Sequence, residues 1–332
     1  MNAFSPETPD GERKDTMSNT PPKAYPSTLQ AIGNTPLVQL RKLVPADSAT
    51  VFVKLEYFNP TGSYKDRMAL AMIEEAEARG DLRRGMTVVE YTAGSTGSSL
   101  AFVCAVKGYP FRVVSSDAFA REKLQTMQAF GAELTIVPSQ GGQITPDLIP
   151  RMMEEARTIA SSQKETYWTN QVYNTDSLKG YATIGQELLQ QVDGPIHAFC
   201  GGVATAGMLM GVAGVLRQAQ RSVRIIALEP ASSAVISTGR AGTHHVEGIG
   251  LGFLPPLLRK DLYDEARGID EAEARQLARQ LAKEEGIFGG VSTGLNVLGA
   301  LQVARELGPG HTVVTVAVDT GLKYLAGDLY AI

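Results

Sequence analysis

The sequence lacks the features that mark membrane proteins and nucleic-acid-binding proteins. Its apolar residues occur in short runs, and none approaches the roughly 18 consecutive apolar residues that a membrane-spanning helix needs. Basic residues are not in excess, because 31 Lys and Arg are interspersed with 35 Asp and Glu, for a net charge of −4. No positive field is therefore available for nucleic acid or acidic lipid, and a small-molecule ligand is favoured.

Cysteine is scarce as well, with only Cys104 and Cys200 in 332 residues. Both lie within apolar runs and at no metal-ligand spacing, so we predict two buried thiols in a reducing cytoplasm. The pair His244 and His245 has no carboxylate or cysteine at ligand spacing, so no metal site is predicted.

The first 26 residues contain no apolar core segment and are rich in Pro, Ser, Thr and charge. We therefore predict a disordered tail over residues 1–26 and no secretory signal, which is consistent with a cytoplasmic protein. The sequence leaves open whether Met1 or Met17 is the true start.

Beyond the tail, short apolar runs alternate with segments of helical periodicity. In residues 65–80, Ala69, Met72, Ile73 and Ala76 recur at helical spacing, and Gly80 predicts the end of the helix. Strands are predicted at residues 51–58, 87–91, 111–115, 133–137, 196–200, 224–229 and 312–318. Further helices are predicted from the end of the loop at 92–99 to Gly108, after the turn at 201–207, and around residues 118–129, 147–161, 176–191, 271–284 and 295–306. Apolar strands separated by helices favour two α/β domains, each with an open, mostly parallel sheet flanked by helices.

Small, flexible residues follow three of the predicted strands. The turns "TAGSTGSS" (92–99) and "GGVATAG" (201–207) each lie between a strand and a helix, and "DTG" (319–321) ends the last strand. Backbone N–H groups and the helix dipole make such strand-to-helix turns suitable for anions. Neither turn fits the nucleotide-binding patterns G-x-x-x-x-G-K-[ST] or G-x-G-x-x-G, so a kinase or dehydrogenase is disfavoured.

A lysine lies at another such junction. The segment "NPTGSYKDR" (59–67) places Lys65 behind a tight turn, where an extended run gives way to helical spacing. A lysine can form an imine with an aldehyde cofactor, and pyridoxal phosphate is the aldehyde cofactor that also carries a phosphate. We therefore predict that one glycine-rich turn binds the cofactor phosphate and the other binds the carboxylate of an amino-acid substrate.

The motifs resemble a known family in their order along the chain. They are "IGNTPLVQL" (32–40), "KLEYFNPTGSYKDR" (54–67), "TAGSTG" (92–97), "NQVYN" (170–174), "GIGLGF" (248–253), "EEGIFGGVSTG" (284–294) and "VDTGLKYL" (318–325). This series is similar to that of the cysteine synthase and cystathionine β-synthase group, which are pyridoxal-phosphate enzymes of fold type II, with a tryptophan-synthase-β-like fold. The resemblance implies that the cofactor lies between the two domains.

The resemblance also implies roles for particular residues. Lys65 forms the imine with the cofactor, Gln171 contacts the substrate carboxylate, and the Thr320 hydroxyl faces the pyridine nitrogen. The carboxylate loop corresponds to Thr92, Ala93, Gly94, Ser95 and Thr96, of which Ser95 also contacts the cofactor. The remaining cofactor-binding residues implied are Gly202, Val203, Ala204, Thr205, Ala206, Gly207, Met208 and Gly248, with the phosphate held by residues 204–208.

The sequence departs from the family pattern in both turns. Ala93 lacks a hydroxyl, and Ser95 replaces an asparagine amide with a shorter hydrogen-bonding group. In the phosphate turn, Ala204 and Ala206 replace glycines and Met208 replaces a threonine, so binding there depends more on backbone N–H groups and on Thr205. Alanine tolerates positive φ poorly, which constrains the turn.

The implied chemistry is β-replacement. A hydroxyl at the pyridine nitrogen disfavours a long-lived carbanion and suits loss of the α-proton with prompt expulsion of a group from Cβ, which gives an aminoacrylate. We predict that the substrate is an O-activated serine, such as O-acetylserine or O-phosphoserine, and that sulfide or another small nucleophile adds to give cysteine or a related β-substituted alanine. Two alternatives stay open: β-elimination or racemisation of serine, threonine or cysteine, and a non-catalytic cofactor-binding homologue with a regulatory role.

The predicted domains are not contiguous in the sequence. A large cofactor-binding domain is expected to comprise residues 27–65 and 171–332, and a smaller mobile domain that carries the carboxylate loop is expected to comprise residues 66–170. The family also suggests a homodimer.

Overall fold

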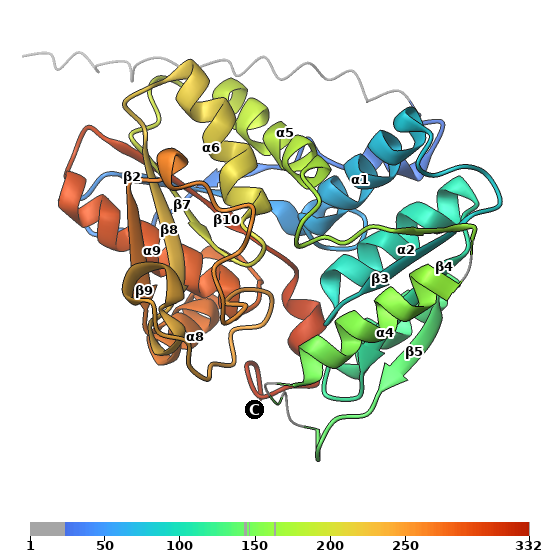
Figure 1. The fold of residues 1–332 in the computed structure, drawn as a ribbon. Helices are drawn as coiled ribbons and strands as arrows, with labels where there is room; N and C mark the ends of the chain where they lie inside the picture. Colours follow the sequence, from blue (N-terminus) through green and yellow to red (C-terminus); the bar gives the residue numbers. More distant parts are fainter. Residues whose placement is uncertain (1–23, 143–144, 146, 163, 332) are drawn as a thin grey trace, which may run out of the picture.

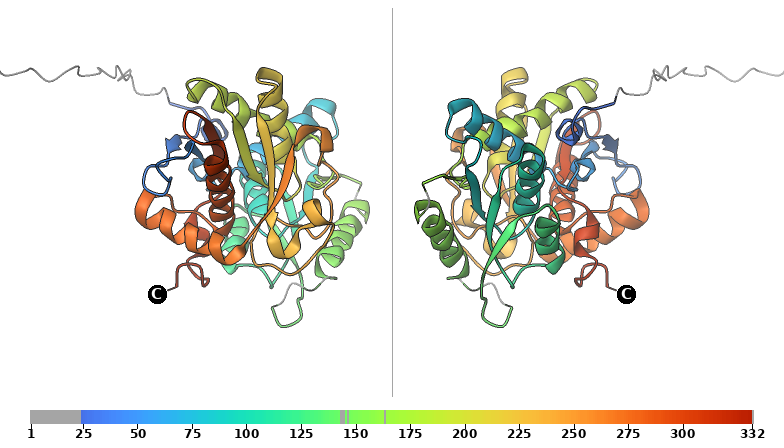
Figure 2. Two further views of the ribbon diagram at one scale, coloured as in Figure 1. Left: turned by 90° about the vertical axis from the view of Figure 1, so that its left-hand side faces the viewer. Right: turned by 90° about the vertical axis from the view of Figure 1, so that its right-hand side faces the viewer.

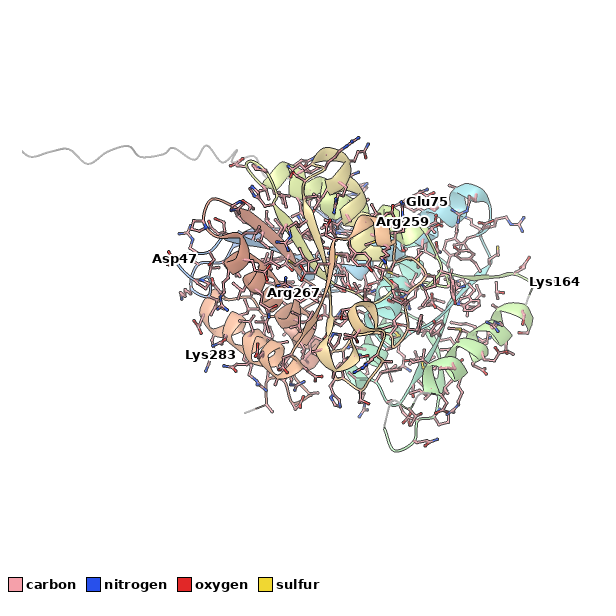
Figure 3. All side chains as sticks on the ribbon, turned by 60° about the vertical axis from the view of Figure 1, so that its left-hand side comes forward. Asp47, Glu75, Lys164, Arg259, Arg267 and Lys283 are labelled. Atoms are coloured by element: carbon pink, nitrogen blue, oxygen red, sulfur yellow. The ribbon has the colours of Figure 1, made fainter. Side chains whose placement is uncertain are left out.

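The computed structural model describes residues 24–142, 145, 147–162 and 164–331. Most of the predicted tail, residues 1–23, lies outside the described residues. Within the described ranges, no helix combines the length and apolar character needed to cross a membrane. Charged side chains of both signs, including Asp47, Glu75 and Lys283, project from different elements around the molecule (Figure 3).

The chain forms two separate sheets (Figure 1). The larger sheet has six strands in the order β1-β2-β10-β7-β8-β9, all parallel except that β1 runs antiparallel to β2. Its strands are β1 (Leu37–Gln39), β2 (Thr50–Leu55), β7 (Ala198–Gly202), β8 (Arg224–Pro230), β9 (Glu265–Ile269) and β10 (Thr312–Ala317). The predicted fold class, α/β with two mostly parallel sheets flanked by helices, is confirmed.

The smaller sheet is entirely parallel and has the order β5-β4-β3-β6. Its strands are β3 (Thr87–Tyr91), β4 (Phe111–Ser116), β5 (Glu133–Val137) and β6 (Thr166–Trp168). The strands of this sheet lie within residues 87–168 and those of the larger sheet come from both sides of that segment in the sequence. The domain boundaries given above stay a prediction.

The helices cover both faces of each sheet (Figure 2). They are α1 (Lys65–Arg79), α2 (Ser95–Lys107), α3 (Arg121–Ala129), α4 (Leu148–Ser162), α5 (Asp176–Gln191), α6 (Gly207–Ala219), α7 (Val235–Thr238), α8 (Glu271–Gln280) and α9 (Val291–Leu307). One apolar cluster joins α1, α2, α5 and α6 to Val88 and Val113 of the smaller sheet and to Phe199 and Val314 of the larger. A second cluster packs α8 and α9 on the opposite face of the larger sheet, and a third packs α4 on the smaller.

Most of the predicted elements are present with small changes at their ends. Helix α5 has the predicted bounds, and Gly80 ends α1 with φ 77°, as expected of a glycine at this position. The strand predicted to reach residue 58 ends at Leu55 and continues as a short 3-10 turn. The helix predicted over 271–284 becomes a π turn from Leu281, and α9 begins at Val291 instead of residue 295. The loop predicted over 92–99 is shorter, because α2 begins at Ser95. Both cysteines are buried, as predicted.

Candidate active site

Lys65 is the first residue of α1, and the turn before it is attached to the end of β10. The N–H of Tyr64 donates to the carbonyl of Val318 at 3.1 Å, and the N–H of Thr320 donates to the carbonyl of Gly62 at 3.0 Å. Gly62 has φ +70°, and a Cβ added there would lie 2.7 Å from the Cγ2 atom of Thr320. A glycine is therefore required for the turn to approach the end of β10 this closely.

The lysine side chain is buried in this position, with 7% of its surface exposed. Its Nζ atom lies 5.1 Å from the centre of the Tyr64 ring and 6.0 Å from the centre of the Tyr181 ring. Burial lowers the pKa of Lys65 to about 8, against the opposing charges of Asp319 and Glu90. A larger fraction of free amine is thus available near neutral pH than for an exposed lysine, which suits attack on an aldehyde.

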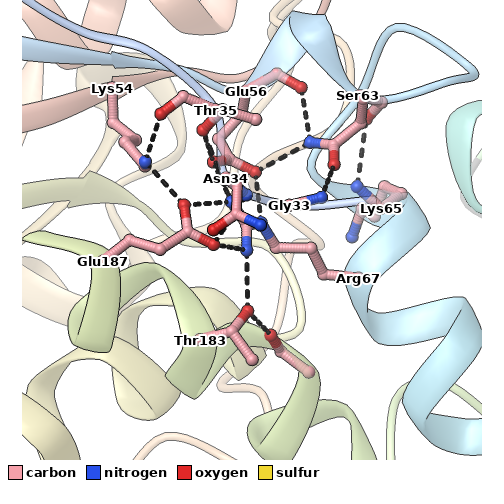
Figure 4. A network of polar contacts seen from close by, with 12 residues as sticks. Gly33, Asn34, Thr35, Lys54, Glu56, Ser63, Lys65, Arg67, Thr183 and Glu187 are labelled. Carbon is pink, nitrogen blue, oxygen red and sulfur yellow. Dashed lines mark hydrogen bonds and ion pairs between the residues drawn. The ribbon is translucent and has the colours of Figure 1, made fainter. Parts of the chain in front are cut away.

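A buried ionic network holds the start of α1 in place (Figure 4). The Arg67 guanidinium contacts Glu56 Oε2 through Nε at 2.8 Å and Glu187 Oε1 of α5 through Nη1 at 2.6 Å. Lys54 of β2 also contacts Glu187, at 2.6 Å. The network therefore connects α1, two residues beyond Lys65, to both α5 and the larger sheet.

The predicted carboxylate loop lies between β3 and α2. The Thr92 side chain accepts a hydrogen bond from the Gly94 N–H at 3.1 Å, and the Thr96 hydroxyl donates to Gln171 Oε1 at 2.7 Å. No side-chain cap closes the N-terminal end of α2, which begins at Ser95. The structure thus brings Gln171 to the loop that precedes it by about 75 residues, as the resemblance implies.

Glu90 is a residue of this site that the sequence interpretation missed. It is buried in β3, and its Oε2 atom accepts hydrogen bonds from the Gln171 N–H at 2.9 Å and from the Thr169 hydroxyl at 2.7 Å. Burial raises the pKa of Glu90 to about 7, although these hydrogen bonds act in the opposite direction. The signal available in the sequence was a glutamate inside the otherwise apolar run "VVEY". In the structure, Glu90 holds the backbone of Gln171 beside the carboxylate loop.

The predicted phosphate turn lies between β7 and α6. Ala206 is the N-cap of α6, with φ 68° and no side-chain cap bond. The first N–H groups of a helix have no partner within the helix, so they are available here to an anion. Neighbouring residues are held by other elements: the Gly202 N–H donates to Asn296 Oδ1 at 2.7 Å and the Val203 N–H to the Leu228 carbonyl at 2.9 Å.

Contacts near the end of β10 connect the two sheets. The Ser95 hydroxyl of the carboxylate loop donates to Asp319 Oδ2 at 3.3 Å, and the Tyr324 hydroxyl donates to the same oxygen at 2.8 Å. Lys123 of α3 forms an ion pair with Glu247, which immediately precedes Gly248 in the segment between α7 and β9. The loop, the lysine turn and the end of β10 therefore lie together.

Several buried polar atoms around this region have no hydrogen-bond partner within the described part of the chain: Ser98 Oγ, Asn170 Oδ1, Tyr181 Oη, Ser292 Oγ and Asp319 Oδ1. Such atoms are rare in folded proteins, and here they indicate a site that a polar ligand completes. Thr320 is different, because its Oγ1 atom already accepts a hydrogen bond from the Leu322 N–H at 3.3 Å. Ser292 was missed by the sequence interpretation, although it lies in the quoted motif "EEGIFGGVSTG".

These residues fit pyridoxal phosphate. The group needs an amine for its aldehyde, N–H donors for its phosphate and a polar contact for its ring nitrogen. Lys65, the uncapped N-terminus of α6 and the unpartnered Ser292 hydroxyl offer these three kinds of contact.

Comparisons with known proteins agree with this geometry. Residues 28–319 match the family described as "Pyridoxal-phosphate dependent enzyme". A cysteine synthase of Staphylococcus aureus is 42% identical over 313 residues, which cover 93% of this chain and 98% of that protein.

Solved structures of similar proteins have the same fold as this chain. The cysteine synthase of Entamoeba histolytica superposes with a TM-score of 0.87 at 32% identity, over 100% of this chain and 95% of that chain. A hydrogen sulfide-producing enzyme of Fusobacterium nucleatum superposes with a TM-score of 0.86 at 32% identity, over 92% of this chain and 99% of that chain.

Proposed function

Because the chain belongs to the family of pyridoxal-phosphate-dependent enzymes, we propose that it catalyses β-replacement on an O-activated serine. In this reaction sulfide, or another small nucleophile, replaces the group on Cβ and gives cysteine or a related β-substituted alanine. The observation that carries the proposal is the buried Lys65, which lies at the end of β10 together with the carboxylate loop. The similarity to cysteine synthases supports the same reaction.

We assign the cofactor contacts to this chain's residues as follows. Lys65 holds the aldehyde carbon, and the backbone N–H groups of residues 204–208 with the Thr205 hydroxyl hold the phosphate, with Gly202, Val203 and Gly248 around them. For the ring nitrogen, the first candidate is the Thr320 hydroxyl, which accepts a hydrogen bond from the Leu322 N–H and still has its proton to donate. The buried and unpartnered Ser292 hydroxyl is a second candidate.

When bound, pyridoxal phosphate withdraws electrons from Cα of the amino acid and makes the α-proton removable. The amino group of the substrate would displace Lys65 from the aldehyde carbon, and the freed Lys65 amine, with its pKa of about 8, would then be suited to take that proton and to return it later. The carboxylate of the substrate binds to the N–H groups and hydroxyls of the loop, formed by Thr92, Ala93, Gly94, Ser95 and Thr96, and to the Gln171 amide. This contact fixes the Cα–H bond toward the lysine.

One alternative reaction has an observation in its favour. The similar structure from Fusobacterium nucleatum is a hydrogen sulfide-producing enzyme. Release of sulfide from cysteine by β-elimination would use the same lysine and the same carboxylate loop. The two reactions are distinguished by whether a nucleophile is needed to form the product.

The experiment uses the purified holoenzyme with O-acetylserine, O-phosphoserine, serine, threonine and cysteine in turn, each with and without sulfide. Cysteine formed from an O-activated serine only in the presence of sulfide supports β-replacement. Pyruvate or 2-oxobutyrate formed without a nucleophile supports elimination instead. Absence of turnover with every substrate would contradict the proposal and favour a regulatory cofactor-binding protein.

The variant Lys65→Ala tests the assignment of the lysine. We expect it to lose both the visible absorption of the covalently bound cofactor and the activity, because the amine is removed. Lys283→Ala removes an exposed lysine and serves as the matched control. An unchanged visible band in Lys65→Ala would refute the assignment. The homodimer, the cytoplasmic location and the mobile smaller domain stay predictions, and light scattering would test the first of them.

A further inference from the structure

Tyr181 of α5 lies against the first turn of α6 and is fully buried. A Cβ added to Gly211 would lie 2.9 Å from the Cβ atom of Tyr181, whereas one added to Gly207 would lie 3.2 Å from its Cε2 atom. The ring therefore runs from Gly211 toward Gly207, which is the first residue of α6. The ring edge that carries Cε2, next to the carbon bearing the hydroxyl, therefore lies at the first residue of this helix.

The hydroxyl has no hydrogen-bond partner among the residues that the structure describes. An unsatisfied buried hydroxyl destabilises a fold, so such a group calls for an explanation in the functional state. Burial raises the pKa of Tyr181 well above its ordinary value, with the charges of its neighbours acting in the same direction. The hydroxyl consequently stays protonated and is available as a donor.

A nearby hydroxyl gives a useful contrast. Ser177, also of α5, approaches the same point, since a Cβ on Gly207 would lie 3.0 Å from its Oγ atom. Its hydroxyl donates to the Asn174 carbonyl at 2.8 Å and is already engaged. Of these two α5 hydroxyls, only that of Tyr181 is without a partner.

The position of Tyr181 relative to Lys65 indicates which group of the cofactor the hydroxyl would contact. The lysine Nζ atom lies 6.0 Å from the centre of the Tyr181 ring. The tyrosine ring is therefore close both to the lysine and to the uncapped start of α6. In pyridoxal phosphate the aldehyde and the phosphate-bearing carbon are attached to adjacent ring atoms, so a group that bridges these two protein features lies close to the phosphate.

We propose that the Tyr181 hydroxyl donates a hydrogen bond to the phosphate group of the cofactor at the first turn of α6. This donor would strengthen a turn in which Ala204, Ala206 and Met208 provide no side-chain hydrogen bond. The proposal rests on the proposed function only in that pyridoxal phosphate is the cofactor, and not on which reaction is catalysed.

The test is Tyr181→Phe, which removes the hydroxyl and keeps the ring. Apo-protein is titrated with pyridoxal 5′-phosphate and with unphosphorylated pyridoxal, and binding is followed by visible absorption and equilibrium dialysis. We expect the variant to bind pyridoxal phosphate on the order of tenfold more weakly, because a hydrogen bond to a charged group is lost. Binding of pyridoxal is expected to stay within about twofold of the original chain. The 31P resonance of the bound phosphate should also move.

Two controls separate this role from packing. Tyr109→Phe removes a buried tyrosine hydroxyl that donates to Glu77 at 2.8 Å, away from α6, and should leave both affinities unchanged. Apo Tyr181→Phe should be at least as stable as the original apo-protein in urea, since an unpartnered hydroxyl has been removed. Equal weakening of both ligands, no weakening of either, or a loss of apo stability would overturn the proposal. If the β-replacement assay shows no product while Tyr181→Phe still weakens the binding of pyridoxal phosphate and not of pyridoxal, that outcome overturns only the proposed reaction and leaves the role of Tyr181 standing.

Discussion

Replacing Glu187 by glutamine tests the ionic network that supports Lys65. The change keeps the shape of the side chain but removes the negative charge that Arg67 and Lys54 share. Both cations are buried, Lys54 with 0% and Arg67 with 3% of its surface exposed. After the substitution Lys54 retains only neutral partners, the Thr35 carbonyl at 2.5 Å and the Gln191 Oε1 atom at 2.7 Å. A buried charge would be left without an adequate counter-ion.

The magnitude follows from the state of Glu187 in the fold. Burial alone would raise the pKa of this carboxyl, but the hydrogen bond and charge of Arg67, followed by the Lys54 hydrogen bond, lower it from 4.5 to about 2. A pKa difference of this size corresponds to about 3 kcal/mol of folding free energy. Removing one partner of a buried ion pair costs a similar amount, about 3 to 5 kcal/mol. We therefore expect Glu187→Gln to lower the free energy of unfolding by about 3 kcal/mol at neutral pH.

The sign of the pH dependence gives a second readout. Because the pKa of Glu187 is lower in the folded state, its stabilisation is complete above the ordinary pKa and is lost as the pH falls from about 4.5 to about 2. Urea unfolding, followed by the fluorescence of Trp168, the only tryptophan, and by circular dichroism, measures both effects. The variant should lose less stability than the original chain across this acid range.

The matched control is Glu306→Gln, since Glu306 also pairs with an arginine, Arg267, at 2.7 Å. The Glu306 side chain is 46% exposed, so its loss should cost less than about 1 kcal/mol. Equal losses in the two variants, or an unchanged acid profile in Glu187→Gln, would refute the reasoning.

Three further predictions concern the site itself. Ala206→Gly should raise the free energy of unfolding of the apo-protein by up to about 1 kcal/mol in urea titrations, because Ala206 has φ 68°; a loss of stability would contradict this. Glu90→Gln should raise the KM for the amino-acid substrate about tenfold with a smaller change in kcat, since both Glu90 oxygens accept N–H donors, from Tyr91 on one side and from Gln171 on the other, and an amide N–H2 would face one of them; equal changes in both constants would argue against a positioning role. The rate at which apo-protein gains the visible band of bound pyridoxal phosphate should rise with pH and level off above about 8, the pKa of Lys65; a rise that continues toward pH 10.5 would show an ordinary amine.

The parts of the fold that the sequence predicts are those with a strong local pattern. Strands in the interior of a sheet, such as β10, are mostly apolar, and α5 has a continuous apolar stripe. The three strands that were missed, β1, β6 and β9, all lie at sheet edges. Each is at most five residues long and none of them has more than one fully buried residue, so its apolar content does not distinguish it from a loop.

The late start predicted for α9 has a different cause. The residues "GGVSTG" before position 295 have the composition of a loop, but Gly290 and Gly294 are small because other groups approach them closely. A Cβ on Gly290 would lie 2.5 Å from the Tyr324 ring, and one on Gly294 would overlap the Ala274 carbonyl of α8. Glycine here reflects helix packing, and only the tertiary structure reveals this.

The same distinction applies to the candidate site. Lys65 and the two small-residue turns could be found because each is defined by a few consecutive residues. Glu90, Tyr181 and Ser292 could not be assigned in this way, because their importance comes from burial and from partners, or the lack of partners, that lie far away in the sequence. A buried polar atom without a partner is a property of the folded chain alone.

The position of β10 has a consequence for how the protein is made. It is the last strand along the residues that the structure describes, yet it pairs with β2 on one side and β7 on the other, in the middle of the larger sheet. A nascent chain that still lacks residues 312–320 has a gap between those strands, and the turn before Lys65 lacks its contacts with Val318 and Thr320. Residues up to Thr320 must therefore be synthesised before the polypeptide can capture its cofactor, and products terminated before them would remain unloaded and open to proteolysis.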